Sequence, residues 1–132
     1  MAEPDSTPPD PIPVTLFICR TCKRAEDAPE APRAGARLAA LLADPPAGVR
    51  VRAVDCLANC KRGPSAAMTR QDGWSYIFGD LHPEEDAAAL FEGARLLGAS
   101  ADGLMPWRGR PEALKRGMIA RIPPLNLPEL TS

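Results

Sequence analysis

The stretch Val14-Thr-Leu-Phe-Ile-Cys19-Arg-Thr-Cys22 joins a short apolar run to a pair of cysteines. A second stretch, Val49-Arg-Val-Arg-Ala-Val-Asp-Cys56-Leu-Ala-Asn-Cys60, repeats this arrangement with an alternating run. Short runs rich in β-branched residues are typical of strands, and they predict strands at 13–18 and 49–54. Each pair of cysteines therefore follows the end of a predicted strand, and these four are all the cysteines of the chain.

The segment between the two strands predicts a helix over 34–43. Its leucines, Leu38, Leu41 and Leu42, recur at helical spacing, and the run Asp44-Pro-Pro46 ends it. The order is then strand, helix, strand, for which the crossover is right-handed and the strands are parallel. Parallel neighbours end at the same edge of a sheet, so we expect both pairs of cysteines to lie together.

The following residues predict a hairpin and a second helix. A short strand at 65–69 leads to the turn Gln71-Asp-Gly73, and the aromatic run Trp74–Phe78 is the returning strand. The helix begins near His82-Pro83 and continues to Leu97. The full order, β-α-β and then β-β-α, is that of a thioredoxin-like α/β fold around a four-stranded mixed sheet.

Composition bounds the domain organisation and the class of protein. A chain of 132 residues is one domain by size, and its net charge of −1 gives no basic field for nucleic acid. We expect a disordered proline-rich leader at 1–12 and the folded domain at 13–98. Residues 99–132 are expected to form an irregular, proline-rich extension with a short helix at 112–118. The leader lacks the basic and apolar regions of a secretory signal, and no apolar run reaches the length of a membrane span.

Without an export signal the cytoplasm is the expected location, and thiols stay reduced there. Two structural disulfides are therefore the weaker interpretation of the cysteines. Four thiolates at one sheet edge can instead hold one metal ion or iron–sulfur cluster, and we predict that Cys19, Cys22, Cys56 and Cys60 share such a centre. Cys19 and Cys22 alone could form a redox dithiol, which would leave the second pair unexplained.

Spacing bears on which metal is bound. Zinc sites usually combine two short Cys-x-x-Cys knuckles, whereas here the second pair is Cys-x-x-x-Cys and 33 residues separate the pairs. A [2Fe–2S] cluster needs two cysteines on each iron and tolerates a wider separation. We favour the cluster and keep zinc as the alternative. Several other residues flank the cysteines as candidates for supporting or docking roles: Arg20, Lys23, Arg24, Asn59, Lys61, Arg62, Gly63 and Pro64.

The flanking cations have two interpretations: a solvated rim, or a basic collar that docks an acidic redox partner. The glycine and the proline suit a close approach of the backbone to the cluster, and equally an ordinary turn. The single histidine, His82, and the acidic residues after it suit the start of a helix rather than a ligand set or a catalytic site.

The segment Cys56-Leu-Ala-Asn-Cys60-Lys-Arg-Gly-Pro64, followed by an aromatic hairpin and a helix, resembles the thioredoxin-like [2Fe–2S] ferredoxins. The resemblance covers about residues 14–98. It implies that Cys56 and Cys60 are cluster ligands, that the fold is thioredoxin-like, and that the protein could form a homodimer. Ala58 stands where glycine is usual, so we expect a slightly less sharp turn. The first two cysteines are closer together than in those ferredoxins.

Two C-terminal patterns, Arg108-Gly-Arg-Pro111 and Ala120-Arg-Ile-Pro-Pro124, are similar to those of a family of small bacterial proteins described as predicted metal-binding. Genes of that family are often found near cobalamin-biosynthesis genes. The combined expectation is a small electron carrier, or an electron-transfer accessory of a biosynthetic enzyme that could act in cobalamin synthesis. A zinc-binding structural or metal-handling module and a thiol–disulfide oxidoreductase are the alternatives. Nothing in the chain suggests a substrate pocket with acid–base groups.

Overall fold

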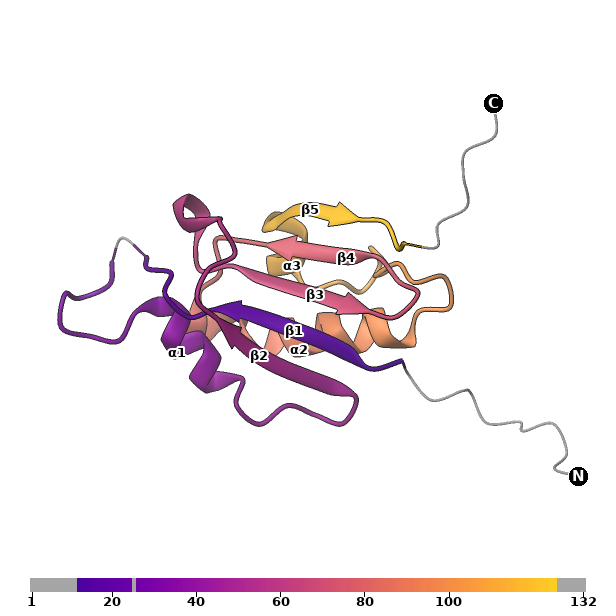
Figure 1. Ribbon diagram of the computed structural model, residues 1–132, viewed down its shortest axis with the longest axis horizontal. Coiled ribbons are helices and arrows are strands. Elements are labelled where there is room, and N and C mark those ends of the chain that lie inside the picture. The colour runs from indigo at the N-terminus through magenta and orange to yellow at the C-terminus, as the bar shows by residue number, and fades with distance from the viewer. Residues whose placement is uncertain (1–11, 25, 126–132) are drawn as a thin grey trace, which may run out of the picture.

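Five strands form one mixed sheet in the order β2-β1-β3-β4-β5 (Figure 1). The structure is a computed structural model, and it describes residues 12–24 and 26–125. Strand β1 (Val14–Cys19) runs parallel to β2 (Val49–Val54), while β3 (Ala66–Arg70), β4 (Ser75–Phe78) and β5 (Met118–Ile122) continue the sheet in antiparallel pairs. The helices are α1 (Ala34–Leu41), α2 (Pro83–Ala99), α3 (Glu112–Arg116) and the short 3-10 helix η1 (Cys60–Arg62).

The pairing of β1 with β2 confirms the predicted β-α-β unit. The two strands are in register along their whole length, from Val14 opposite Val49 to Cys19 opposite Val54. Helix α1 lies in the connection between them, as a parallel crossover requires. The β3–β4 hairpin and α2 follow in the predicted order.

The core lies between the sheet and one layer of helices. Alternate residues of β1, which are Val14, Leu16 and Ile18, are buried and pack in one cluster with residues of α1, α2 and α3. Figure 1 shows these helices on the same side of the sheet. On the opposite side, Phe17 and Ile77 are half-buried. Within the described residues, no helix combines the length and apolar character needed to cross a membrane.

The sheet has five strands rather than the four expected from the sequence. The predicted short helix ends at Arg116, and the chain then turns at Gly117 and adds β5 beside β4. A five-residue run such as Met118–Ile122 has weak local preferences. It becomes a strand because the edge of β4 offers unpaired backbone groups.

Candidate metal centre

Both cysteine segments lie at the same end of the sheet, as expected. Cys19 is the last residue of β1, and Cys56 follows the end of β2 by two residues. Cys60 begins η1. Figure 1 shows the segments after β1 and β2 leaving the sheet at one end. This end is where the carboxyl ends of parallel strands place their loops together.

The first pair is buried. Cys19 is 0% exposed, Cys22 is 3% exposed, and their Sγ atoms lie 2.9 Å apart, with the Cys22 thiol as donor. The Thr21 hydroxyl lies 3.7 Å from the Cys19 Sγ. Burial raises the pKa of the Cys19 thiol, but hydrogen bonds from the Cys22 thiol and the Thr21 backbone N–H stabilise its thiolate, and the net effect lowers that pKa. Cys19 is thus favoured in the form that binds metals.

The second pair is held by a sharp turn. The side chain of Cys56 is exposed, and the backbone N–H of Ala58 donates to its Sγ at 3.1 Å. Ala58 has a φ of 60°, in the left-handed region that favours glycine. The expectation of a less sharp turn is wrong, because the alanine adopts the backbone conformation that a glycine would take. The side chain of Cys60 lies outside what the structure describes.

Asp55 connects the two segments. Its backbone carbonyl oxygen lies 3.6 Å from the Cys19 Sγ and accepts a hydrogen bond from the Thr21 hydroxyl. Its carboxylate forms an ion pair with Arg20 at 2.6 Å. The residue before Cys56 therefore contacts the first cysteine pair directly.

Asn59 and Ser65 hold the second segment against the sheet. The Asn59 amide donates to the buried hydroxyl of Ser65 at 2.9 Å, and the Ser65 carbonyl accepts the backbone N–H of Cys19 at 3.0 Å. The Gly63–Pro64 peptide bond just before Ser65 is cis. At the end of β4, a Cβ on Gly79 would lie 2.7 Å from both the Arg62 carbonyl and the Asn59 amide nitrogen. Only a glycine at 79 fits this approach without displacing the segment.

Three of the five basic residues around the cysteines form ion pairs with neighbouring carboxylates. Arg20 pairs with Asp55, Arg24 with Glu26 at 2.5 Å, and Arg62 with Asp80 at 2.9 Å. Lys23 and Lys61 are exposed, and among the described residues neither has a carboxylate partner. Three neighbouring carboxylates thus offset three of the five charges.

The described side chains do not form a closed metal site. Among them, no group of three or more histidine, cysteine, aspartate or glutamate residues is placed to hold an ion. The donors nevertheless suit a thiophilic centre in kind: two buried thiols in contact, and a third sulfur that already accepts a backbone N–H. Closing a shared site would need Cys56 to turn toward the first pair.

Sequence reasoning missed three residues that organise this end of the sheet: Thr21, Asp55 and Ser65. Each is adjacent in sequence to a residue that was singled out, since Thr21 lies within the first pair, Asp55 precedes Cys56 and Ser65 follows Pro64. Their positions beside these candidates could have identified them from the sequence. Their contacts could not be predicted, because they join residues 34 or more positions apart in the chain.

The sheet order, the β-α-β and β-β-α units and the cysteine segments define a thioredoxin-like α/β protein. The chain belongs to the family described as "Protein of unknown function (DUF1636)", which matches residues 16–124. Among solved structures, it is similar to a thioredoxin-like [2Fe–2S] ferredoxin from Aquifex aeolicus, with 16% sequence identity and a TM-score of 0.53. That match covers 88% of this chain and 98% of the ferredoxin. No curated protein matches this chain in sequence.

Proposed function

We propose that this protein binds a [2Fe–2S] cluster through Cys19, Cys22, Cys56 and Cys60 and acts as a small electron carrier. The cluster would supply one-electron chemistry when bound. The chain's own residues would hold it, shield one side of it and donate hydrogen bonds to its ligands. An electron-transfer accessory of a biosynthetic enzyme falls within the same proposal, and cobalamin synthesis remains the expectation from the sequence resemblance.

The observation that carries the proposal is the contact between the two cysteine segments at the ends of adjacent parallel strands. The Cys19 thiol lies 3.6 Å from the carbonyl of Asp55, the residue before Cys56. The N–H of Ala58 on the Cys56 sulfur is the type of hydrogen bond that tunes the potential of iron–sulfur clusters. The structural similarity to a protein titled a thioredoxin-like [2Fe–2S] ferredoxin supports the choice of cluster.

Zinc is the alternative centre for the same four cysteines. A structural zinc site also uses thiolates, and hydrogen bonds to its sulfurs would serve it equally well. The wide separation of the two pairs argues for the cluster, since each iron can take one pair. Metal analysis separates the two alternatives directly.

A dithiol function for the first pair has one observation in its favour. The Cys19 and Cys22 sulfurs are 2.9 Å apart and the pKa of the Cys19 thiol is lowered by hydrogen bonds against the effect of burial. Burial of both residues opposes it, because thiol–disulfide exchange needs an accessible attacking sulfur. A metal-free protein whose first pair equilibrates with glutathione would favour this function.

The test is anaerobic purification followed by a visible spectrum and metal analysis. We expect a brown protein with about two irons and two acid-labile sulfides per chain. Each single Cys→Ser variant at the four positions should lose most of the cluster, while Ser75→Ala, at a half-buried position at the start of β4, should retain it. Zinc with no sulfide would replace the cluster with the alternative centre. Full metal content in all four cysteine variants would refute a shared centre.

Two parts of the expected function concern other molecules. An acidic redox partner and a homodimer both stay predictions, and neither nucleic acid nor a membrane is expected as a partner. Sedimentation equilibrium of the cluster-loaded protein decides whether a second copy is bound. The location in the cytoplasm also stays a prediction.

A further inference from the structure

Arg110 is a buried cation outside the cysteine site. It is 7% exposed, and its guanidinium donates to the carbonyls of Met105 at 2.5 Å and Pro106 at 3.3 Å and to the Met118 sulfur at 3.4 Å. Its carbon Cζ lies 5.5 Å from the ring centre of Tyr76 and 5.0 Å from that of Trp107. These contacts are dipoles, a thioether and aromatic rings. Within the described part of the chain, no carboxylate forms an ion pair with Arg110.

A buried charge without a counter-ion is costly, because dipoles replace only part of its lost hydration. Burial accordingly lowers the pKa of Arg110. A guanidinium stays protonated in proteins at neutral pH, so Arg110 cannot relieve this cost by losing its proton. An anion bound beside it would relieve the cost instead.

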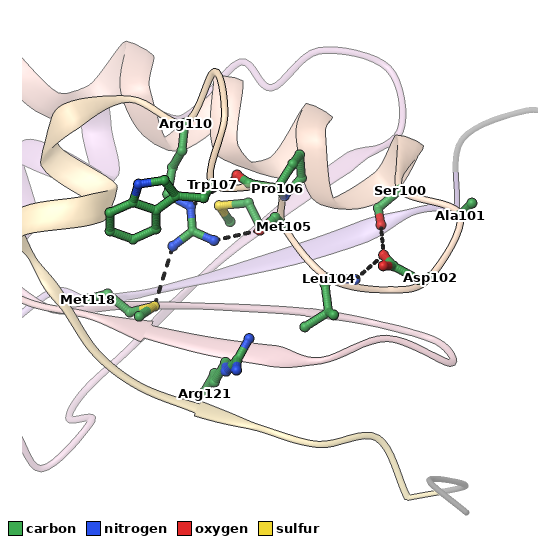
Figure 2. Close-up of a pocket in the computed structure, with 10 residues that line it drawn as sticks. All are labelled: Ser100, Ala101, Asp102, Leu104, Met105, Pro106, Trp107, Arg110, Met118 and Arg121. Carbon is green, nitrogen blue, oxygen red and sulfur yellow. Dashed lines mark hydrogen bonds between the residues drawn. The ribbon is translucent and has the colours of Figure 1, made fainter.

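A cavity of about 740 Å³ lies beside this guanidinium, between the segment 100–107 and β5. Its volume is within the range of small-molecule sites. Figure 2 shows Arg110 reaching into it from one wall and Arg121 of β5 from the opposite wall. Arg121 lies 4.7 Å from the ring centre of Trp74, and no described carboxylate forms an ion pair with it.

The remaining walls are mostly apolar. Leu104, Pro106, Trp107 and Met118 line the space between the two arginines. The lining also holds one carboxylate, Asp102, which accepts hydrogen bonds from the Ser100 hydroxyl at 2.6 Å and the Leu104 N–H at 3.1 Å. The cavity thus combines two cations and one carboxylate with mostly apolar and aromatic walls, and its lining carries a net positive charge.

We propose that this cavity binds an amphipathic organic carboxylate, whose carboxylate lies between Arg110 and Arg121 and whose apolar body contacts Trp107 and Met118. Arginine suits a carboxylate because its planar N–H groups match the two oxygens. An inorganic anion would fit this cavity less well, because it would leave the apolar lining uncovered. The site shares no residue with the cysteine segments.

The competing explanation is purely structural. Arg110 could serve only to hold the carbonyls of Met105 and Pro106 and to pack on two rings. If Arg110 had only this structural role, a substitution of Arg121 on the opposite wall would not change the affinity for an added ligand. Arg121 therefore provides the decisive variant, because its side chain is exposed and supports no described hydrogen bond.

The test uses phenylacetate as the probe on the full chain purified with its native metal content. The uncharged 2-phenylethanol has the same ring, and acetate has the same carboxylate without the ring. The chain has two tryptophans, and both lie against the arginines of the cavity, so tryptophan fluorescence reports binding. Calorimetry checks the affinity, and Trp74→Phe leaves Trp107 as the single reporter.

We expect phenylacetate to bind at least about tenfold more tightly than either control compound, as a charge-assisted contact requires. Arg121→Ala should weaken phenylacetate about tenfold and leave 2-phenylethanol unchanged. The matched control Arg52→Ala removes the same charge from an exposed position on β2 and should bind as the parent does. Arg110→Lys should also weaken binding, with circular dichroism as the check on folding.

Three results would overturn the proposal. The first is no saturable binding of phenylacetate, and the second is equal binding of phenylacetate and 2-phenylethanol. The third is equal phenylacetate affinity in Arg121→Ala and Arg52→Ala. None of these depends on the iron–sulfur proposal, because the readouts are binding and fluorescence at a separate site.

Discussion

The backbone of Ala58 determines how the second cysteine segment presents its sulfur. With a φ of 60°, the residue turns its own N–H toward the Cys56 Sγ at 3.1 Å. A residue with a Cβ pays for this left-handed conformation through a close contact with a carbonyl oxygen, at roughly 1–2 kcal/mol. The alanine is therefore a source of local strain beside a candidate ligand.

We predict that Ala58→Gly stabilises the protein by up to about 1 kcal/mol, because relief of the left-handed strain exceeds the added entropy of the unfolded chain. Urea unfolding of the reduced protein measures the change. The control is Ala53→Gly, an exposed position within β2, which should lose about 0.5–1 kcal/mol. A loss of stability in both variants would contradict the prediction.

Asp27 organises the long loop between the first cysteine pair and α1. Its Oδ2 accepts the backbone N–H of Arg24 at 3.0 Å and of Ala34 at 2.9 Å, and its Oδ1 lies 3.2 Å from Arg37. Arg33, at the helix cap position, makes no side-chain cap bond, so Asp27 supplies that acceptor from within the loop. The N–H of Arg24, then that of Ala34 and the charge of Arg37, lower the pKa of Asp27.

A lowered pKa makes the contribution of Asp27 depend on pH in a defined direction. The stabilisation is fully present above the unfolded pKa of about 4 and is lost as the pH falls through the lower folded pKa. Asp27→Asn should therefore be less stable than the parent at pH 7, and the difference should shrink below about pH 4. Urea unfolding at several pH values measures this. Glu30→Gln, which removes an exposed charge from the same loop, should show no such trend.

At the scale of elements, α1 is fitted closely onto the end of β1. A Cβ on Gly35, in the first turn of α1, would lie 2.0 Å from the carbonyl oxygen of Cys19. The N–H of Gly35 also donates to the Cys22 carbonyl at 2.9 Å. The helix therefore supports both cysteines of the first pair through backbone contacts that leave no space for a side chain.

Gly35→Ala tests this contact by the sign of its effect. Helix propensity alone would stabilise the protein by up to about 1 kcal/mol, whereas the clash should destabilise it by about 1–3 kcal/mol and reduce metal retention. Thermal and urea unfolding give the sign. Ala40→Gly, at an exposed position of α1, calibrates the propensity alone. Stabilisation by Gly35→Ala would show that the helix can move away without cost.

At the scale of the whole molecule, charge around the cysteine end is balanced more than the sequence suggested. Asp55, Glu26 and Asp80 pair with three of the five cations, which leaves Lys23 and Lys61 as the exposed charges able to attract an anionic partner. Attraction of this kind weakens with salt, because the Debye length falls to about 3 Å at 1 M.

We predict that Lys61→Glu slows oxidation of the reduced protein by ferricyanide several-fold at low ionic strength, and that the difference disappears near 1 M salt. Stopped-flow absorbance measures the rates. Arg50→Glu makes the same change of charge at the opposite end of β2 and should have little effect. Equal rates for both variants at every salt concentration would show that the basic residues near the cysteines are solvated and do not attract the oxidant.

Local signals in the sequence determined the strands, the helices and the positions of the cysteines. Periodicity and turn residues act over a few positions, so they placed β1, α1, β2, the hairpin and α2, and put both cysteine pairs at strand ends. The parallel pairing then followed from the length of the crossover.

Tertiary contacts decided the remainder. Strand β5 exists because β4 offers an edge, and the strained turn at Ala58 is held where Asn59 bonds to Ser65. Likewise, Asp55 reaches the first cysteine pair, and Arg110 is buried beside Tyr76, across 34 residues of chain in each case. These features depend on groups far apart in sequence, whose meeting no local pattern encodes, because the free energy that fixes them arises only once the sheet has assembled.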